Sequence, residues 1–191
     1  MHLPRITGLT GLAGSGKDAV RAMLEQDHGY SGLAFADPMR RMLASLIEYV
    51  GADPLYMSER AFKEALIPQV GASYRELAQT LGTEWGRAIR PDLWVRMAEA
   101  RLDSLRHAHR GATEPLRVVI SDVRFLNEAE WIRDAGGEVW RIERPNVAPV
   151  RHHQSERELL QIHADQLLLN DGSMEDLWVR VSTLCEARVL P

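Results

Sequence analysis

Lys17 closes a glycine-rich stretch, GLAGSGK, which begins at Gly11 and has the form G-x-x-x-x-G-K. The chain has only two lysines among its 23 basic residues, and one of them stands here. In such a loop the glycines let the backbone curl until successive N–H groups point at phosphate oxygens, while the lysine ammonium reaches the β and γ phosphates. The helix expected after the loop adds the partial positive charge of its N-terminus. The stretch therefore predicts the binding of a nucleotide or another phosphate.

The residue after the lysine is Asp18, where loops of this kind usually carry a Ser or Thr whose hydroxyl holds Mg²⁺. One interpretation makes Asp18 a metal ligand, either directly or through water. The other is that a carboxylate in the first helical turn simply favours the helix dipole. The residue alone leaves both interpretations open.

Asp122 is a second candidate for phosphate chemistry, because it directly follows the apolar run Leu116–Ser121. Open parallel sheets place their ligand crevice just beyond the carboxyl ends of buried strands. In phosphate-loop proteins an acid at this point orients Mg²⁺ or its water, so we expect Asp122 and Lys17 to face one another across a triphosphate. The alternative is that Asp122 caps the next helix. Arg124, two residues further on, is well placed for an acceptor phosphate.

Further arginines are candidates for the donors that phosphoryl transfer requires on the equatorial oxygens. Arg144, Arg151 and Arg157 bracket a polar segment. We expect this segment to close over the reaction as a lid. Among these arginines, Arg151 is our candidate for a direct part in catalysis.

Alternating strands and helices must position these residues. Apolar runs predict strands at Ile6–Thr10, Gly32–Ala36, Leu116–Ser121, Glu138–Ile142 and Gln166–Leu169. Periodicity and capping signals predict helices at Asp18–Gln26, Pro38–Val50, Ser73–Leu81, Pro91–His109, Phe125–Ala135 and from Ser173 onward. We expect Gly82 to end the third of these helices, and Trp85, Trp94 and Trp131 to lie in the core. The alternation indicates an α/β fold with a parallel sheet.

Composition narrows the class of protein. With 191 residues and 45% hydrophobic content, the chain is long enough for one substantial core with a small inserted subdomain. The net charge of −4 gives no reason to expect a nucleic-acid polymer as partner. The single cysteine, Cys185, excludes an intrachain disulfide and fits a reducing compartment. No stretch approaches the roughly 20 apolar residues of a membrane span, so we expect a cytoplasmic protein without membrane contact.

Over nearly its whole length the chain resembles the deoxynucleoside monophosphate kinases of tailed bacteriophages and prophages. The matching blocks are Gly11–Asp18, Phe35–Pro38, Gln79–Arg87, Asp92–Trp94, Ser121–Glu130, His153–Glu156 and Asn170–Gly172. The block Ser121–Glu130 is the most specific of them. In that family the loop also tends to end in Gly-Lys-Asp, so Asp18 becomes a supporting feature.

The resemblance implies a three-layer P-loop kinase fold with a central parallel sheet of about five strands in a single domain, 1–191. Within it, the core would comprise residues 1–50, 91–144 and 158–191. A helical insertion that binds the acceptor would span about 51–90, and a small lid about 145–157.

The resemblance also implies roles for individual residues. Lys17 and the rest of the loop would bind ATP, with Arg144 and Asn170 near its adenine; the loop residues are Gly11, Ala13, Gly14, Ser15, Gly16 and Asp18. The deoxynucleotide would be bound by Asp37, Arg40, Gln79, Arg87, Asp92 and Arg124. From the residues themselves, and not from the resemblance, our candidates for catalysis are Lys17, Asp122, Arg124 and Arg151, and our candidates for holding Mg²⁺ are Asp18 and Asp122.

We therefore predict an ATP-dependent kinase that phosphorylates a small-molecule deoxynucleoside monophosphate to the diphosphate, with ATP as donor and Mg²⁺ as cofactor. It would act in the host cytoplasm if phage-encoded, and the family is compatible with a homodimer. The first alternative is a kinase for another small acceptor, such as dephospho-coenzyme A, a sugar acid or phosphomevalonate. The second is a nucleotide-binding switch or ATP hydrolase that acts on a macromolecule. Acceptor-stimulated ADP formation separates a kinase from a hydrolase.

Overall fold

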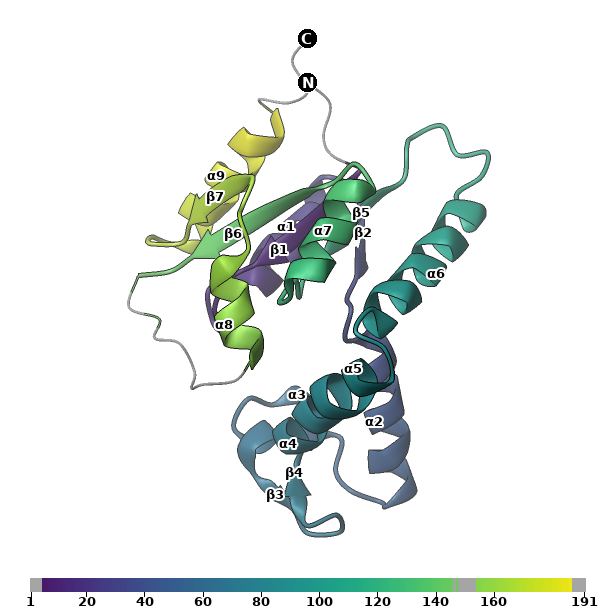
Figure 1. The fold of residues 1–191 in the computed structure, drawn as a ribbon. Coiled ribbons are helices and arrows are strands. Elements are labelled where there is room, and N and C mark those ends of the chain that lie inside the picture. Colours follow the sequence, from purple (N-terminus) through teal and green to yellow (C-terminus); the bar gives the residue numbers. More distant parts are fainter. Residues whose placement is uncertain (1–4, 146, 148–153, 187–191) are drawn as a thin grey trace. The chain divides into compact units, whose positions relative to one another are not determined.

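The computed structural model describes residues 5–145, 147 and 154–186, with the backbone alone at 154–157 (Figure 1). The chain divides into two compact units. The sheet unit comprises the residues up to Ala34 and those from Ala100 onward, and the helical unit comprises Phe35–Glu99.

A five-stranded parallel sheet forms the centre of the sheet unit. Its strands are β1 (Ile6–Thr10), β2 (Tyr30–Leu33), β5 (Arg117–Ile120), β6 (Glu138–Glu143) and β7 (Gln166–Leu169). They lie in the order β2-β5-β1-β6-β7, and every neighbouring pair is parallel. Both faces of β1 and β5 are covered, so all five residues of β1 and the last three of β5 are buried. This arrangement confirms the predicted α/β fold with a parallel sheet.

Helices cover the two faces of this sheet and make the sheet unit a three-layer structure. On one face, α1 (Lys17–Asp27) and α9 (Met174–Glu186) pack side by side over a core that includes Leu9, Leu24 and Trp140. On the other, α7 (Leu126–Asp134) packs on β1 and β6, and α8 (Gln154–Gln161) packs on α7. Gly8 of β1 leaves room for Ile132 of α7, whose Cδ1 would meet a Cβ at 2.5 Å.

The helical unit is built mainly from short helices. They are α2 (Asp37–Tyr49), α3 (Leu55–Ser58), α4 (Tyr74–Gln79), α5 (Gly86–Ile89) and the first part of α6 (Leu93–Ala108), with one 3₁₀ turn, η1 (Phe62–Glu64). A two-stranded antiparallel hairpin joins β3 (Leu66–Ile67) to β4 (Ala72–Ser73). The capping box predicted for α4 is confirmed, because Ser73 Oγ accepts from the N–H of Glu76 at 3.2 Å and the Glu76 carboxylate accepts from the N–H of Ser73 at 2.8 Å.

The expected helix end at Gly82 is wrong. The helix continues through a π-helical turn, η2 (Thr80–Trp85), directly into α5. Inside a π turn the backbone bonds shift by one residue, and here the carbonyl of Gly82 accepts the indole N–H of Trp94 at 2.7 Å. Trp94, twelve residues away, thus bonds to the Gly82 carbonyl, which water would bond if the helix ended at this glycine.

The tryptophans divide between core and surface. Trp94 is buried, as expected, but 46% of Trp85 is exposed, so the expectation for Trp85 is wrong. Trp131 is half-buried. The two rings of Trp85 and Trp94 lie 6.5 Å apart.

Among the described residues, no helix combines the length and apolar character that crossing a membrane requires.

Replacing Gly86 with Ala should lower the free energy of unfolding by about 1–3 kcal/mol, because overpacking a rigid neighbour has costs of this size. A Cβ on this buried glycine would lie 2.7 Å from Cε2 and 2.9 Å from Nε1 of the Trp94 ring. Urea unfolding followed by tryptophan fluorescence measures the change. Gly82→Ala is the matched control, because its Cβ would meet the flexible Met39 sulfur at 3.1 Å. Equal stability of the two variants would contradict this packing.

Candidate active site

The predicted phosphate loop connects β1 to α1 in the sheet unit. Gly11 and Gly16 adopt φ angles of 141° and 107°, in a region that residues with side chains rarely occupy. The space around both is closed as well. A Cβ on Gly11 would collide with the carbonyl oxygen of Ile142, and one on Gly16 with the amide of Asn170. The two glycines therefore let the loop lie against the carboxyl ends of β6 and β7.

Helix α1 begins where the loop ends. Its N-cap residue is Gly16, and no side chain caps its first turn within the described residues. Because the first N–H groups of a helix have no partner inside the helix, such an end can bind an anion. Lys17 is half-buried, and its Nζ donates to the carbonyl oxygens of Gly11 and Leu12, both at 2.7 Å. The ammonium thus lies back over the loop.

Asn170 ties the loop to the far end of the sheet. It directly follows β7 and is buried, with 7% of its surface exposed. Its Nδ2 donates to the carbonyl oxygen of Ser15 at 2.8 Å, and its backbone N–H donates to the carbonyl of Glu143 at 2.7 Å. One residue therefore joins the loop, the end of β6 and the end of β7. The sequence places Asn170 in a matching block but carries no signal for this contact, whose partners are 155 residues apart.

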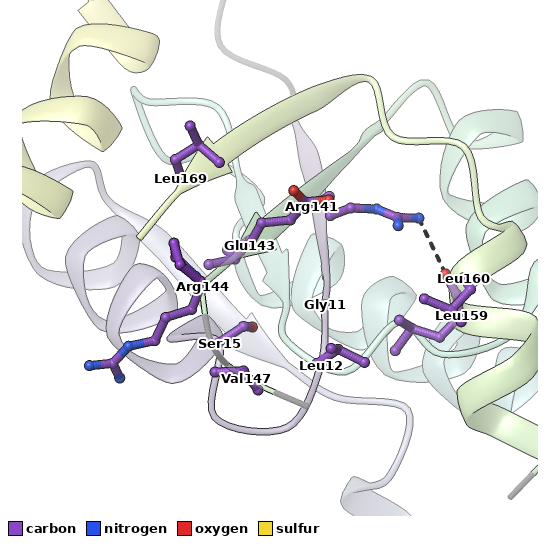
Figure 2. A pocket seen from close by; sticks show the side chains of 12 residues that line it. Gly11, Leu12, Ser15, Arg141, Glu143, Arg144, Val147, Leu159, Leu160 and Leu169 are labelled. Carbon is purple, nitrogen blue, oxygen red and sulfur yellow. Dashed lines mark hydrogen bonds between the residues drawn. The ribbon is translucent and has the colours of Figure 1, made fainter. Parts of the chain in front are cut away.

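A cavity of about 250 Å³ lies beside the loop, between the end of β6 and α8 (Figure 2). Gly11, Leu12 and Ser15 line it from the loop, and Arg144 and Leu159 line it from the other side. The Ser15 hydroxyl is buried and has no hydrogen-bond partner among the described residues. A buried hydroxyl without a partner is costly, which marks this wall as one that a polar ligand would complete.

Arg141 holds α8 beside this cavity, a role that the sequence did not indicate. In Figure 2 its side chain extends from β6 to the end of α8, where the guanidinium donates to the carbonyl of Leu159 at 3.3 Å. It also donates to the carbonyl of Ile162. An arginine on the last carbonyls satisfies groups that a helix end leaves without partners. The exposed Arg144 lies three residues further along the chain.

Asp122 lies at the same edge of the sheet as the loop. β1 and β5 are neighbours with Gly8 paired to Ile120, so the loop and Asp122 leave adjacent strand ends. Asp122 is buried, with 8% of its surface exposed, whereas Arg124 is exposed. The N-cap residue of α7 is Phe125, so Asp122 is not the capping residue of this helix.

Two acids at this edge of the sheet, Asp18 and Asp122, are candidate ligands for a magnesium ion. Asp18 lies exposed in the first turn of α1, and Asp122 is buried after β5. Among the described residues, no three His, Cys, Asp or Glu side chains gather as a metal cage. Mg²⁺ prefers oxygen ligands and usually keeps several waters while binding one or two carboxylates and the substrate phosphates. Two carboxylates fit that pattern of binding.

The remaining predicted residues lie in the helical unit, where several are paired. Asp37 and Arg40 form an ion pair of 3.1 Å, and Arg87 donates to the carbonyl of Pro91 at 3.1 Å. Gln79 is exposed at the end of α4. Arg151 lies outside the described residues, as does most of the segment expected to form the lid.

Asp92 stands between two arginines. Arg90 Nε donates to one carboxylate oxygen at 3.0 Å, and Arg96 Nε donates to the other at 2.7 Å. The hydrogen bonds from Arg90 and then Arg96 lower the pKa of Asp92 to about 2. The side chain is therefore an anion at neutral pH and can only accept hydrogen bonds.

Comparisons with known proteins show which family the chain belongs to. The family model for deoxynucleotide monophosphate kinase matches residues 63–181, which is more than half of the chain. A protein of Acanthamoeba polyphaga mimivirus, named as a candidate deoxynucleotide monophosphate kinase, is 29% identical over 184 residues, covering 92% of this chain and 93% of the relative. The deoxynucleotide monophosphate kinase of Escherichia phage RB69 is 28% identical over 112 residues, covering 59% of this chain and 44% of the relative.

The fold is shared with a solved structure. The crystal structure of TT1252 from Thermus thermophilus superimposes with a TM-score of 0.51 at 22% identity, covering 99% of this chain and 100% of that one. The family match covers the second half of the helical unit and includes Asp122 and Asn170. The chain therefore belongs to the deoxynucleotide monophosphate kinase family and is a phosphotransferase.

Proposed function

We propose that the chain transfers the γ-phosphoryl group of ATP to the 5′-phosphate of a deoxynucleoside monophosphate, giving the diphosphate and ADP. The family match over residues 63–181 is the observation that carries this proposal. This range includes three of the matching blocks that would contact the acceptor, namely Gln79–Arg87, Asp92–Trp94 and Ser121–Glu130. The phosphate loop at Gly11–Lys17 lies outside the matched range and supports the donor half of the reaction independently.

On the donor side, the loop amides and Lys17 bind the phosphates of ATP. Arg144 and Asn170 lie near its adenine, for which the cavity beside the loop offers space. Ser15 contributes a buried hydroxyl to the same wall. Asn170 acts twice in this scheme, because its amide also fixes the Ser15 carbonyl and so the shape of the loop.

Asp18 and Asp122 would hold the magnesium ion, which would neutralise charge on the donor phosphates. Placing one acid on α1 and the other after β5 lets them reach the ion from two neighbouring strand ends. Asp122 is the buried acid of the two, so its carboxylate is the better ordered.

On the acceptor side, Arg124 takes the 5′-phosphate, because a guanidinium matches the geometry of phosphate oxygens. The deoxynucleoside is bound by residues of the helical unit: Asp37, Arg40, Gln79, Arg87 and Asp92. With its pKa lowered to about 2, Asp92 accepts hydrogen bonds from the substrate and never donates them. Its two arginine partners keep the carboxylate oriented for that task.

No strong general base is required, because the acceptor phosphate is already an anion at neutral pH. The protein aligns two anionic substrates and offsets their repulsion with Lys17 and Arg124, and Arg151 is the candidate for a third positive charge. The acceptor is a free nucleotide, with neither a nucleic-acid polymer nor a membrane as partner. The viral relatives support the host cytoplasm as the setting, and a homodimer is compatible with the family.

The first test offers ATP and Mg²⁺ with dAMP, dCMP, dGMP, dTMP, the ribonucleotides and dephospho-coenzyme A, and measures ADP. We expect ADP formation that depends on a deoxynucleoside monophosphate. Turnover only with dephospho-coenzyme A would replace the acceptor in this proposal. ADP formation that no acceptor stimulates would favour a hydrolase.

Lys17→Ala should lower kcat by about a hundredfold or more, since removing one donor from a developing oxyanion has effects of this size. Its thermal unfolding should stay close to wild type, because the two carbonyls to which the ammonium donates belong to Gly11 and Leu12, which line a cavity that water can enter once the ammonium is gone. Lys63→Ala is the matched control, as it removes the second of the two lysines. Normal turnover by Lys17→Ala would refute the donor site.

Asn170→Ala should raise the KM for ATP by about tenfold, because losing a buried hydrogen bond costs about 1–3 kcal/mol and frees the loop. The KM for the deoxynucleotide should change little, since the contact lies on the donor side. Steady-state kinetics with each substrate varied in turn give both constants. Ser173→Ala serves as control, because it removes the capping bond of α9 at 3.1 Å and leaves the loop contact intact. The proposal fails if both variants behave alike.

A further inference from the structure

We infer that Glu128 is a positioning residue for the phosphoryl transfer, acting through the backbone of the residues that carry Asp122 and Arg124. The inference rests on the proposed function for its kinetic meaning. The residues concerned, Ser121–Phe125, run from the end of β5 to the start of α7 and are called the Asp122 segment here.

The Glu128 carboxylate is buried, with only 3% of the residue exposed. One oxygen, Oε2, accepts the backbone N–H of Arg124 at 2.8 Å and the backbone N–H of Phe125 at 3.1 Å. Burying an ionised carboxylate is costly unless hydrogen bonds satisfy it. Bonds that involve a charged acceptor are also about twice as strong as neutral ones. This carboxylate therefore holds two successive backbone groups firmly.

The rest of the Asp122 segment is fixed by the sheet. The N–H of Ser121 donates to the carbonyl of Leu33 at the end of β2, at 3.3 Å, and the N–H of Val123 donates to the carbonyl of Leu9 in β1, at 3.1 Å. Backbone bonds thus anchor the segment as far as Val123. Beyond that point the chain leaves the sheet, and the bonds to Glu128 take over.

This arrangement differs from ordinary helix capping. In a capping box the acid at the third helical position accepts only the N–H of the N-cap residue. Two such boxes in this chain use exposed acids, Glu76 and Asp176. The acid of α7 is buried instead, and it also accepts the N–H of Arg124, the residue before the N-cap. Phe125, the N-cap residue, has no side-chain acceptor that could return a bond.

The consequence concerns the guanidinium of Arg124. Fixing the peptide on its N-terminal side fixes the direction in which its Cα–Cβ bond leaves the backbone. A displacement of about 1 Å at a substrate-positioning group can cost about a hundredfold in rate. Arg124 is exposed, so its direction depends on the backbone more than on packing. Glu128 thereby sets the position from which Arg124 reaches the acceptor phosphate.

The test compares Glu128→Gln and Glu128→Ala with Ile132→Val in the same helix. Ile132 is fully buried against Gly8, and its apolar side chain makes none of the hydrogen bonds that hold the Asp122 segment, so trimming it weakens α7 and leaves those bonds in place. With the folded fraction held constant, kcat should fall by about tenfold in Glu128→Gln, which keeps a neutral acceptor, and by about a hundredfold in Glu128→Ala. The KM for ATP should stay at the wild-type value in both Glu128 variants. Ile132→Val should keep the wild-type kcat. A wild-type kcat in Glu128→Ala would overturn the inference.

A double-mutant cycle shows whether Glu128 acts through Arg124. In an Arg124→Ala background, Glu128→Ala should lower kcat far less than it does in the wild type, because the group that it positions is already gone. An undiminished effect in that background would mean that Glu128 acts by another route, and the inference would fail.

Amide hydrogen exchange tests the same inference without any activity. The amides of Arg124 and Phe125 should exchange faster in Glu128→Ala than in wild type, and at the wild-type rate in Ile132→Val. Unchanged exchange at both amides in Glu128→Ala would refute the inference. Absence of deoxynucleotide-dependent turnover in the wild type would instead refute the proposed function, and the exchange rates would then decide the role of Glu128 alone.

Discussion

The close approach of the phosphate loop to the ends of β6 and β7 is the constraint on which this site depends. Gly11 lies against the carbonyl of Ile142 and Gly16 against the amide of Asn170, with no space for a side chain at either glycine. Both also need φ angles that other residues rarely adopt. The shape of the loop therefore depends on the ends of β6 and β7 being in place. In turn, these strand ends can pack against the loop only because both positions are glycine.

Charged side chains are used in two ways. Some bond to the backbone, as Lys17 does to loop carbonyls and Glu128 does to backbone N–H groups, so these charges shape the backbone. Others pair with one another, as Asp92 does with Arg90 and Arg96. Exposed pairs of this kind add little stability. Under the proposed function, the pairs around Asp92 hold its carboxylate ready for a polar substrate.

Local patterns carried most of what the sequence could predict. The loop motif, the buried strands and the capping box of α4 each depend on neighbouring residues, and the structure has all three. The π turn was not predictable, because Trp94 takes the carbonyl of Gly82 only after folding. The exposure of Trp85 likewise follows from how the short helices pack.

Within the site, the sequence identified the loop, Asp122 and Asn170 but not the contacts among them. The bond from Asn170 to Ser15 joins residues from opposite ends of the chain, and one sequence contains no record of such a pair. Arg141 and Glu128 were missed for the same reason, since each acts on backbone groups that composition and periodicity do not reveal.

The strand order also governs how the protein can assemble during synthesis. β1 emerges first but lies in the middle of the sheet, and its neighbours β5 and β6 begin only at Arg117 and Glu138. Contacts between such distant segments form slowly, because the intervening chain must first close as a loop. The phosphate loop is synthesised well before its support Asn170, which lies 155 residues after Ser15. The loop therefore acquires its final shape in the nascent chain only after Asn170 has been made.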